Sequence, residues 1–332
     1  MKKTTSRLLS VLLALLMVLS LAACSGGNSG EDEPAEEPVN TELSDTVRVA
    51  ALNGPTGMAT VDLVGVDKIE LTRYQSPDEA VQKFIAGEVD IAAVPSNLAP
   101  VLYNKTDGNV VVLTTVCSGM LYLMENGNSV KSLEDLRGKT IVGSGKGGTP
   151  EYVLTLLLEN AGLKVGEDVE VQWLDAHADV AQALMQTPGA VALLPEPFVS
   201  NVTSKNEAIT IAVDLNEEWK SAYGGSLPMG VIIAKKDFVE SRPGDVAAFL
   251  AMLGDSVADV NTCSDDVAGR IVEAGFLADP EIAKAAIPRC NITCMDPAEN
   301  KATLEPFYNT LFGAAPQAVG GALPGEDFYY AG

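Results

Sequence analysis

Apolar and polar residues are grouped in short blocks along this chain, and the blocks predict buried strands separated by amphipathic helices. A first strand is expected at 46–52, and a second, with alternating apolar residues, at 68–74. The helix that follows has Ser76 as its N-cap and Pro77 in its first turn, and Gly87 ends it. Further strands are expected at 90–94, 110–116 and 120–124.

The same alternation begins again after residue 139, with amphipathic helices between the strands. The expected strands of this second series lie at 140–143, 169–174, 190–194, 208–213 and 229–234. The rest of the chain is expected to be helical and to return to cover the first series. Such an alternation is typical of the α/β class, so we predict α/β layers with mostly parallel strands.

Three basic residues near the N-terminus precede an uncharged run at 8–23, which is the order found in secretory signals. The run has 16 residues, whereas a transmembrane helix needs about 20, so we predict a lipoprotein signal peptide at 1–23. The letters LAAC at 21–24 resemble the bacterial lipobox, in which the cysteine receives a diacylglycerol, and this predicts lipidation of Cys24. The alternative is ordinary secretory cleavage beside an incidental cysteine. The protein is expected to be exported in either case.

Residues 24–45 are rich in glycine, proline and acidic residues and poor in apolar ones. Such a segment buries too little apolar surface to fold, so we predict a solvated tether with a reach of about 25 Å. The expected localisation is the outer face of the bacterial cytoplasmic membrane, where the lipid on Cys24 holds the folded part.

Charge narrows the class of partner. The chain has 45 acidic residues against 22 basic ones, which is a formal net charge of -23. Nucleic-acid binding depends on clustered lysine and arginine, so we expect no nucleic-acid partner. An anionic small molecule is compatible with this charge, because distant charges are screened by salt and local dipoles decide which ligand a cleft accepts.

Four cysteines follow Cys24 in the chain, at positions 117, 263, 290 and 294. An exported protein can form disulfides, and four cysteines allow three complete pairings that the sequence does not distinguish. The spacing of Cys290 and Cys294 is compatible with a metal site, but the chain has a single histidine and no second ligand pair nearby. We therefore predict structural thiols or one disulfide, and no metal or cofactor.

Five segments stand out along the exported chain: VRVAALNGPTGMA from Val47, GEVDIAAVPSNLAPVLYNK from Gly87, SLEDLRGKTIVGSGKGGTPEYVL from Ser132, LLPEPF from Leu193 and AAIPRCNI from Ala285. In this order they resemble the NitT/TauT-type, or NMT1/THI5-like, solute-binding proteins of ABC importers. The resemblance implies a two-domain, type II periplasmic-binding-protein fold with a ligand cleft between the domains. It implies a discontinuous domain 1 at 46–122 plus 235–332, and a domain 2 at 123–234.

Loops that follow predicted strands carry the candidate ligand-binding residues, because ligands of open α/β sheets bind outside the carboxyl ends of the strands. After the first strand, backbone N–H groups and a threonine hydroxyl at a helix N-terminus would face a ligand. These candidates are Asn53, Gly54, Pro55, Thr56 and Gly57. After the strand at 90–94 the candidates are Pro95, Ser96 and Asn97. The alternatives are a tight turn without a ligand in the first loop and simple N-capping by Ser96 in the second.

A glycine-rich loop follows the strand at 140–143, and its backbone donors suit a carboxylate, a sulfonate or another anionic or electron-rich group. The candidates in this loop are Ser144, Gly145, Lys146, Gly147, Gly148 and Thr149. Lys146 either adds a charge to the ligand site or points into solvent. A nucleotide P-loop is excluded, because Leu133 stands where the first glycine of that pattern must be.

Two titratable residues remain as candidates. The resemblance implies a place on the cleft wall for Glu196, where its carboxylate accepts hydrogen bonds from an amine or an aminopyrimidine. The alternative is that Glu196 caps the helix that follows it. His177 is predicted to be a lone, exposed loop residue without a catalytic role, because no Ser, Cys or second carboxylate is recognisable as its partner.

The predicted function is capture of a small molecule by hinge closure and its delivery to the permease and ATPase subunits of an ABC importer. The solutes that the resemblance implies are a sulfonate, a nitrate-like anion or a thiamine-precursor-like pyrimidine. One alternative is a lipid-anchored ligand sensor without transport. The other is an enzyme on the same fold, although the cysteine-rich run of the fungal pyrimidine synthases in the wider family is missing.

Overall fold

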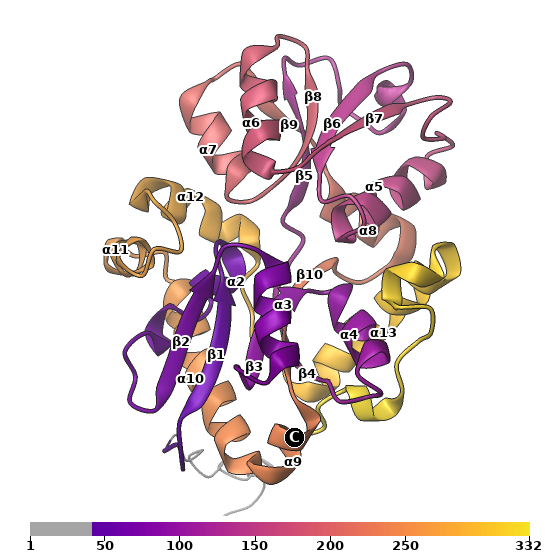
Figure 1. The fold of residues 1–332 in the computed structure, drawn as a ribbon. Helices are drawn as coiled ribbons and strands as arrows, with labels where there is room; N and C mark the ends of the chain where they lie inside the picture. The colour runs from indigo at the N-terminus through magenta and orange to yellow at the C-terminus, as the bar shows by residue number, and fades with distance from the viewer. Residues whose placement is uncertain (1–41) are drawn as a thin grey trace, which may run out of the picture. The chain divides into compact units, whose positions relative to one another are not determined.

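Two five-stranded sheets form the framework of residues 42–332, which the computed structural model describes (Figure 1). The first sheet has the strand order β2-β1-β3-β10-β4, and the second has the order β7-β6-β8-β5-β9. The predicted signal peptide, Cys24 and the predicted tether up to residue 41 lie outside the described residues. No helix within residues 42–332 is both long enough and apolar enough to cross a membrane.

The strands lie close to where the sequence places them. The first sheet contains β1 (Val47–Leu52), β2 (Ile69–Tyr74), β3 (Ile91–Pro95), β4 (Val111–Ser118) and β10 (Pro228–Ala234). The second contains β5 (Leu121–Asn126), β6 (Thr140–Ser144), β7 (Glu170–Leu174), β8 (Val191–Pro195) and β9 (Ile209–Asp214). The predicted α/β class is therefore confirmed.

Half of the strand pairings are antiparallel, so the expectation of mostly parallel strands is wrong. β1 runs parallel to β2 and β3, and β6 runs parallel to β7 and β8. β10 runs antiparallel to β3 and β4, and β5 runs antiparallel to β8 and β9. The reason is that β5 and β10 each enter their sheet directly from the other sheet, and so run against their neighbours.

Helices pack around both sheets. Those that follow strands of the first sheet are α2 (Pro55–Met58), α3 (Pro77–Ala86), α4 (Leu98–Lys105), α9 (Lys236–Ser241), α10 (Pro243–Val260), α11 (Asp265–Glu273), α12 (Pro280–Cys290) and α13 (Pro297–Ala314). Those of the second sheet are α5 (Thr149–Asn160), α6 (His177–Gln186), α7 (Phe198–Lys205) and α8 (Leu215–Tyr223). Figure 1 shows α10 to α13, in orange to yellow, around the first sheet, and α13 packs on β4 and β10 as predicted.

Local sequence signals explain where several helices begin and end. Ser76 accepts a hydrogen bond from the backbone of Glu79 at the start of α3, and Gly87 ends that helix in the left-handed conformation. Asp279 caps α12 in the same way as Ser76 caps α3. No bounds were predicted for α4, α7, α8 and α9, because helices of six to nine residues are too short to show a clear helical period.

The chain passes from one sheet to the other at two places. The first lies between the end of β4 and the start of β5, at Gly119 and Met120, and the second lies between α8 and β10. The amide of Gly119 donates to the carbonyl of Leu227 at 2.8 Å, and the side chain of Asn216 accepts from the amide of Leu227 at 3.2 Å. The two crossing segments are therefore hydrogen-bonded to each other.

Strand β10 bears on the predicted domain boundaries. The predicted domain 2 extends to residue 234, whereas β10 pairs with β3 and β4 of the first sheet and is buried along its whole length. The division into 46–122 plus 235–332 and 123–234 stays a prediction.

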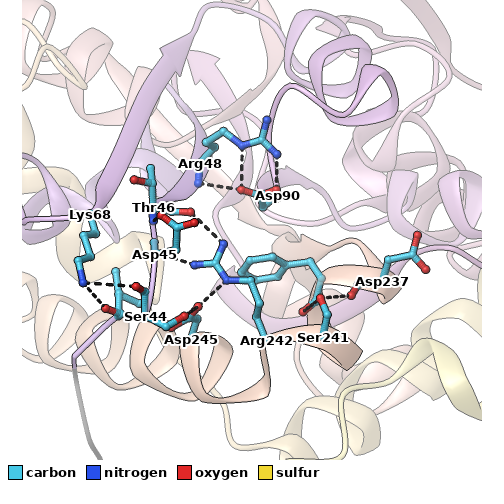
Figure 2. Close-up of polar contacts among 12 residues, drawn as sticks. Ser44, Asp45, Thr46, Arg48, Lys68, Asp90, Asp237, Ser241, Arg242 and Asp245 are labelled. Carbon is cyan, nitrogen blue, oxygen red and sulfur yellow. Dashed lines mark hydrogen bonds and ion pairs between the residues drawn. The ribbon is translucent and has the colours of Figure 1, made fainter.

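A polar cluster at the start of the described chain fixes the entry into β1 (Figure 2). The carboxylate of Asp245, in the first turn of α10, accepts hydrogen bonds from the amide and the hydroxyl of Ser44, both at 2.7 Å. Arg242 pairs with Asp245 at 2.5 Å and donates to the carbonyls of Asp45 and Thr46. Lys68 donates to the carbonyl of Leu43 at 2.7 Å. We call these residues the entry clamp.

Candidate ligand-binding site

The loop after β1 is a closely packed turn. The amide of Gly54, at a φ of 81°, donates to the carbonyl of Phe276 at 3.2 Å. A Cβ at Gly57 would lie 2.3 Å from the Phe276 ring, so only glycine fits there. Asn53 is exposed and is hydrogen-bonded to Arg73 and Gln75, whereas Pro55 and Thr56 are buried. In this structure the glycines serve close packing, and a ligand-binding role for the loop stays a prediction.

The residues after β3 are buried, and their polar side chains are hydrogen-bonded. Pro95 is the last residue of β3 and pairs with Gly230 of β10. The hydroxyl of Ser96 donates to the carbonyl of Pro228 at 2.8 Å, so it does not cap α4, the alternative interpretation from the sequence. Asn97 occupies the N-cap position of α4, but its side chain makes no capping bond.

Thr149, the first residue of α5, connects this loop to the second sheet. Its hydroxyl donates to Oδ1 of Asn97 at 3.0 Å and lies 3.4 Å from the hydroxyl of Ser96. Ser96 is fully buried, and Asn97 and Thr149 are 1% exposed. Two loops that the sequence nominated separately, one after β3 and one after β6, are thus in direct contact.

The glycine-rich loop before Thr149 uses two of its backbone donors within the chain. The amide of Gly147 donates to the carboxylate of Glu151 at 2.5 Å, and the amide of Gly148 donates to the carbonyl of Gly145 at 3.0 Å. The side chain of Lys146 is exposed and makes no polar contact within residues 42–332. The carboxylate of Glu151 therefore occupies one backbone donor of the loop, and ligand binding by the loop stays a prediction.

His177 corrects an expectation. It is the first residue of α6, it is half-buried, and its Nδ1 lies 2.5 Å from the hydroxyl of Ser144. Its ring also contacts the ring of Phe198, with centroids 5.5 Å apart. Burial lowers the pKa of His177 to about 4, so the imidazole is neutral at physiological pH. The prediction of an exposed loop histidine without a serine partner is wrong, because β6 and α6 bring the two residues together.

Glu196, at the end of β8, is enclosed by partners. Its side chain is 0% exposed, and it accepts hydrogen bonds from the amide and the hydroxyl of Ser200, both at 3.0 Å. Arg289 of α12 donates through Nε at 2.5 Å. Glu196 therefore binds the first turn of α7, one of its two predicted roles, and pairs with Arg289, which the sequence analysis did not nominate. The arginine of AAIPRCNI was the available signal.

An apolar groove of about 150 Å³ opens beside this pair, between α7 and the start of α12. It is lined by Pro197, Phe198, Asn201, Leu277, Ala278, Asp279 and Ile282. The Cδ atom of Pro197 lies 3.8 Å from where a Cβ of Gly54 would stand, so the groove adjoins the loop after β1.

The cysteines have free thiols in the described part of the chain, at positions 117, 263, 290 and 294. Burial raises the pKa of Cys117 to about 12 and also raises that of Cys290, so both are poor nucleophiles. Within residues 42–332 no group of three or more His, Cys, Asp or Glu residues is arranged to hold a metal ion.

A family model described as "ABC transporter, phosphonate, periplasmic substrate-binding protein" matches residues 62–260, more than half of the chain. The chain belongs to this family. Export and a role as the substrate-binding component of an ABC transporter follow from membership, as predicted, whereas the NitT/TauT type stays a prediction. A comparison with curated proteins gives no match.

Solved structures show the same fold for this substrate-binding protein. An ABC transporter protein from Parabacteroides distasonis has 24% identity and a TM-score of 0.73, over 86% of this chain and 98% of that one. The periplasmic aliphatic sulphonate binding protein SsuA from Escherichia coli has 16% identity and a TM-score of 0.68, over 86% and 92%. The desulfurization enzyme DSZB has 14% identity and a TM-score of 0.61, over 86% and 96%. These likenesses show a shared fold that carries more than one function.

Proposed function

We propose that this protein captures a small organic anion outside the cell and delivers it to the permease and ATPase of an ABC importer. The observation that carries the proposal is the buried contact of Ser96 and Asn97 with Thr149. These residues come from loops at the carboxyl ends of strands in different sheets, the usual place for a ligand of such sheets. A solute that touches both loops would stabilise the closed arrangement, which a permease can recognise.

The proposed site consists of the three nominated loops, whereas the buried carboxylate of Glu196 pairs with Arg289. Asn53 to Gly57, Pro95 to Asn97 and Ser144 to Thr149 supply backbone amides and hydroxyl groups, and these suit an oxyanion. Support for the solute class comes from the family description, which names phosphonate, and from a structural neighbour that binds aliphatic sulphonates. Both solutes carry a tetrahedral oxyanion on carbon.

A ligand screen by thermal shift tests the proposal. The protein should start at Ser25, because Ser44 and Asp45 belong to the entry clamp. The screen should contain alkylphosphonates, alkylsulfonates, nitrate and thiamine-precursor-like pyrimidines, since the NitT/TauT-type assignment is part of the proposal. A solute at 100 times its dissociation constant stabilises the fold by about 2.7 kcal/mol. If none of these groups raises the melting temperature, the proposed solute class is wrong.

Delivery is tested in cells. Uptake of the labelled solute should require this chain and the permease together. Binding of the solute without any uptake would favour the alternative of a lipid-anchored sensor.

We propose that the protein does not transform its solute. The Ser144–His177 pair favours an enzyme, because a hydroxyl hydrogen-bonded to imidazole is how serine nucleophiles are activated. However, Ser144 is 2% exposed, and no carboxylate among the described residues is hydrogen-bonded to His177 to orient it. Prolonged incubation with the bound solute should leave it intact by NMR. Turnover that disappears in Ser144→Ala would establish the enzyme instead.

We also propose the lipid anchor at Cys24, which lies outside the described residues. Cys24→Ala should move the protein from the membrane fraction to the soluble fraction, whereas the neighbouring Ser25→Ala should not. A Cys24→Ala protein that stays on the membrane would contradict the anchor.

A further inference from the structure

A carboxylate and a guanidinium meet where α7 and α12 pack together. The side chain of Glu196 is 0% exposed, whereas that of Arg289 is 37% exposed. Arg289 donates through Nε to Glu196 at 2.5 Å and through Nη2 to the hydroxyl of Ser200 at 2.7 Å. Ser200 in turn donates to Glu196 through its amide and its hydroxyl. Three donors thus satisfy the buried carboxylate. The bonds to Glu196 and Ser200 hold Arg289 in one position.

The guanidinium keeps donors to spare. Arginine has five N–H donors, and two of them are used in this cluster. Nη1 has no hydrogen-bond partner among residues 42–332. The negative charge of Glu196 is shared among the Ser200 donors, Arg289 and the N-terminal end of α7, so an anion can bind the free edge of Arg289 without displacing Glu196.

The groove beside the cluster is apolar where α12 begins. Ile282 lines this groove, and Arg289 follows it by seven residues on the same helix. Seven residues are about two helical turns, so the two side chains share one face of α12 and lie about 10 Å apart along it. Asp279 also lines the groove and caps α12 at the end away from Arg289. An anionic group is therefore repelled at one end and attracted at the other.

The geometry points to Arg289 as a further residue that binds the oxyanion of the solute, in addition to the loop donors, while the groove between α7 and α12 holds its carbon chain. This inference rests on the proposed function and narrows the solute class. A groove of about 150 Å³ has room for a chain of a few carbons. The preferred solutes are therefore alkylsulfonates or alkylphosphonates with a short apolar chain, and not inorganic sulfate, phosphate or nitrate.

Isothermal titration calorimetry on the chain from Ser25 tests both parts. The probes are methane-, ethane- and butanesulfonate, the three matching phosphonates, and inorganic sulfate and phosphate. Affinity should rise by about fourfold for each added methylene group in the series that binds. The sulfonate and phosphonate arms decide which head group the site prefers. Equal affinity for the methyl and butyl members would overturn the role of the groove.

Variants of the protein test the binding of the head group and of the alkyl chain separately. Arg289→Gln should weaken binding of the butyl probe by about tenfold or more, because a charge-assisted hydrogen bond is lost. Arg137→Gln is the matched control, since Arg137 is 59% exposed and pairs with Asp168 away from the groove. Ile282→Ser should flatten the dependence on chain length, so the butyl probe should lose more affinity than the methyl probe. Arg289→Lys keeps a charge beside Glu196 but loses the planar fork, so it should fold and bind more weakly than the wild type.

The outcomes distinguish the inference from the proposed function. If the butyl probes bind and Arg289→Gln and Arg289→Lys both bind like Arg137→Gln, the inference is wrong and the proposed function stands. If neither series binds to the wild type, the proposed solute class fails together with the inference.

Discussion

His177 lies where β6 and α6 of the second sheet meet, and burial there lowers its pKa to about 4 from the 6.5 of a free imidazole. The folded state therefore prefers the neutral ring. The hydrogen bond ties the ring to Ser144, one of the nominated ligand-binding residues. The side chain of His177 therefore links α6 to a loop of the candidate site through this hydrogen bond.

The first prediction concerns this pKa. The unfolded chain binds a proton at His177 below about pH 6.5, whereas the folded chain binds it only near pH 4. The lowered pKa of His177 therefore has no effect on the free energy of unfolding above pH 6.5. It lowers that free energy progressively as the pH falls to about 4. His177 is the only histidine, so one imidazole signal should titrate near pH 4 by NMR. A midpoint near 6.5 would show that the His177 ring is not buried in solution.

The second prediction concerns Thr149, whose hydroxyl satisfies the buried oxygen of Asn97. Thr149→Val keeps the shape but leaves that oxygen without a donor, so the free energy of unfolding in urea should fall by about 1–3 kcal/mol. Thr155→Val, on the same helix and only half-buried, is the control and should change little. A loss below about 0.5 kcal/mol for Thr149→Val would show that the two loops separate in solution without a ligand.

At the scale of elements, α10 holds the start of β1 through the entry clamp. Asp245 lies in the first turn of α10 and is 3% exposed. Burial works against its charge, but the hydrogen bonds from Ser44 and Arg242 outweigh burial, and the net effect lowers the pKa of Asp245. Figure 2 shows these side chains converging on residues 44–46, next to the point where the described chain begins.

The third prediction is that Asp245→Asn lowers the free energy of unfolding by about 3 kcal/mol at neutral pH, because it breaks a buried ion pair. Since the folded pKa of Asp245 is lowered, its contribution is present above the unfolded pKa of about 3.9 and is lost as the pH falls through the folded pKa. The difference in free energy of unfolding between Asp245→Asn and the wild type should therefore become smaller in acid. Asp255→Asn, at an exposed position of the same helix, should stay within about 0.5 kcal/mol. A loss for Asp245→Asn that stays constant down to pH 2 would contradict this account.

At the scale of the whole described unit, the crossing segments connect the two sheets. Gly119 has a φ of 56°, and a Cβ there would lie 2.4 Å from the side chain of Asn216. Asn216 also binds the amide of Leu227 in the second crossing segment. The junction therefore has no room for any side chain at position 119.

The fourth prediction compares two glycines. Gly119→Ala combines a left-handed conformation with a clash, whereas Gly138→Ala, at a φ of 77° with open space around it, has only the conformational cost of about 1–2 kcal/mol. Thermal unfolding should show a clearly larger loss for Gly119→Ala, by a further 1–3 kcal/mol. Equal losses of unfolding free energy in the two variants would mean that the crossing segments rearrange around the added methyl group without cost.

The sequence carried the local part of this structure. Apolar periodicity placed the strands to within a few residues, and Ser76, Pro77 and Gly87 marked α3, because these signals act between residues close in the chain. The loops at strand ends could be nominated in the same way, since the carboxyl end of a strand is visible in the sequence.

Tertiary structure alone decided how these parts combine. Nothing local indicates that β5 and β10 insert antiparallel into their sheets, because strand order depends on long-range pairing. The pairs Ser96–Thr149, Ser144–His177 and Glu196–Arg289 each join residues far apart in sequence, and a single sequence holds no record of such contacts. Residue types and their periods set the elements, whereas packing between distant segments set the environment of each side chain, and that environment determines its charge, its partners and its chemistry.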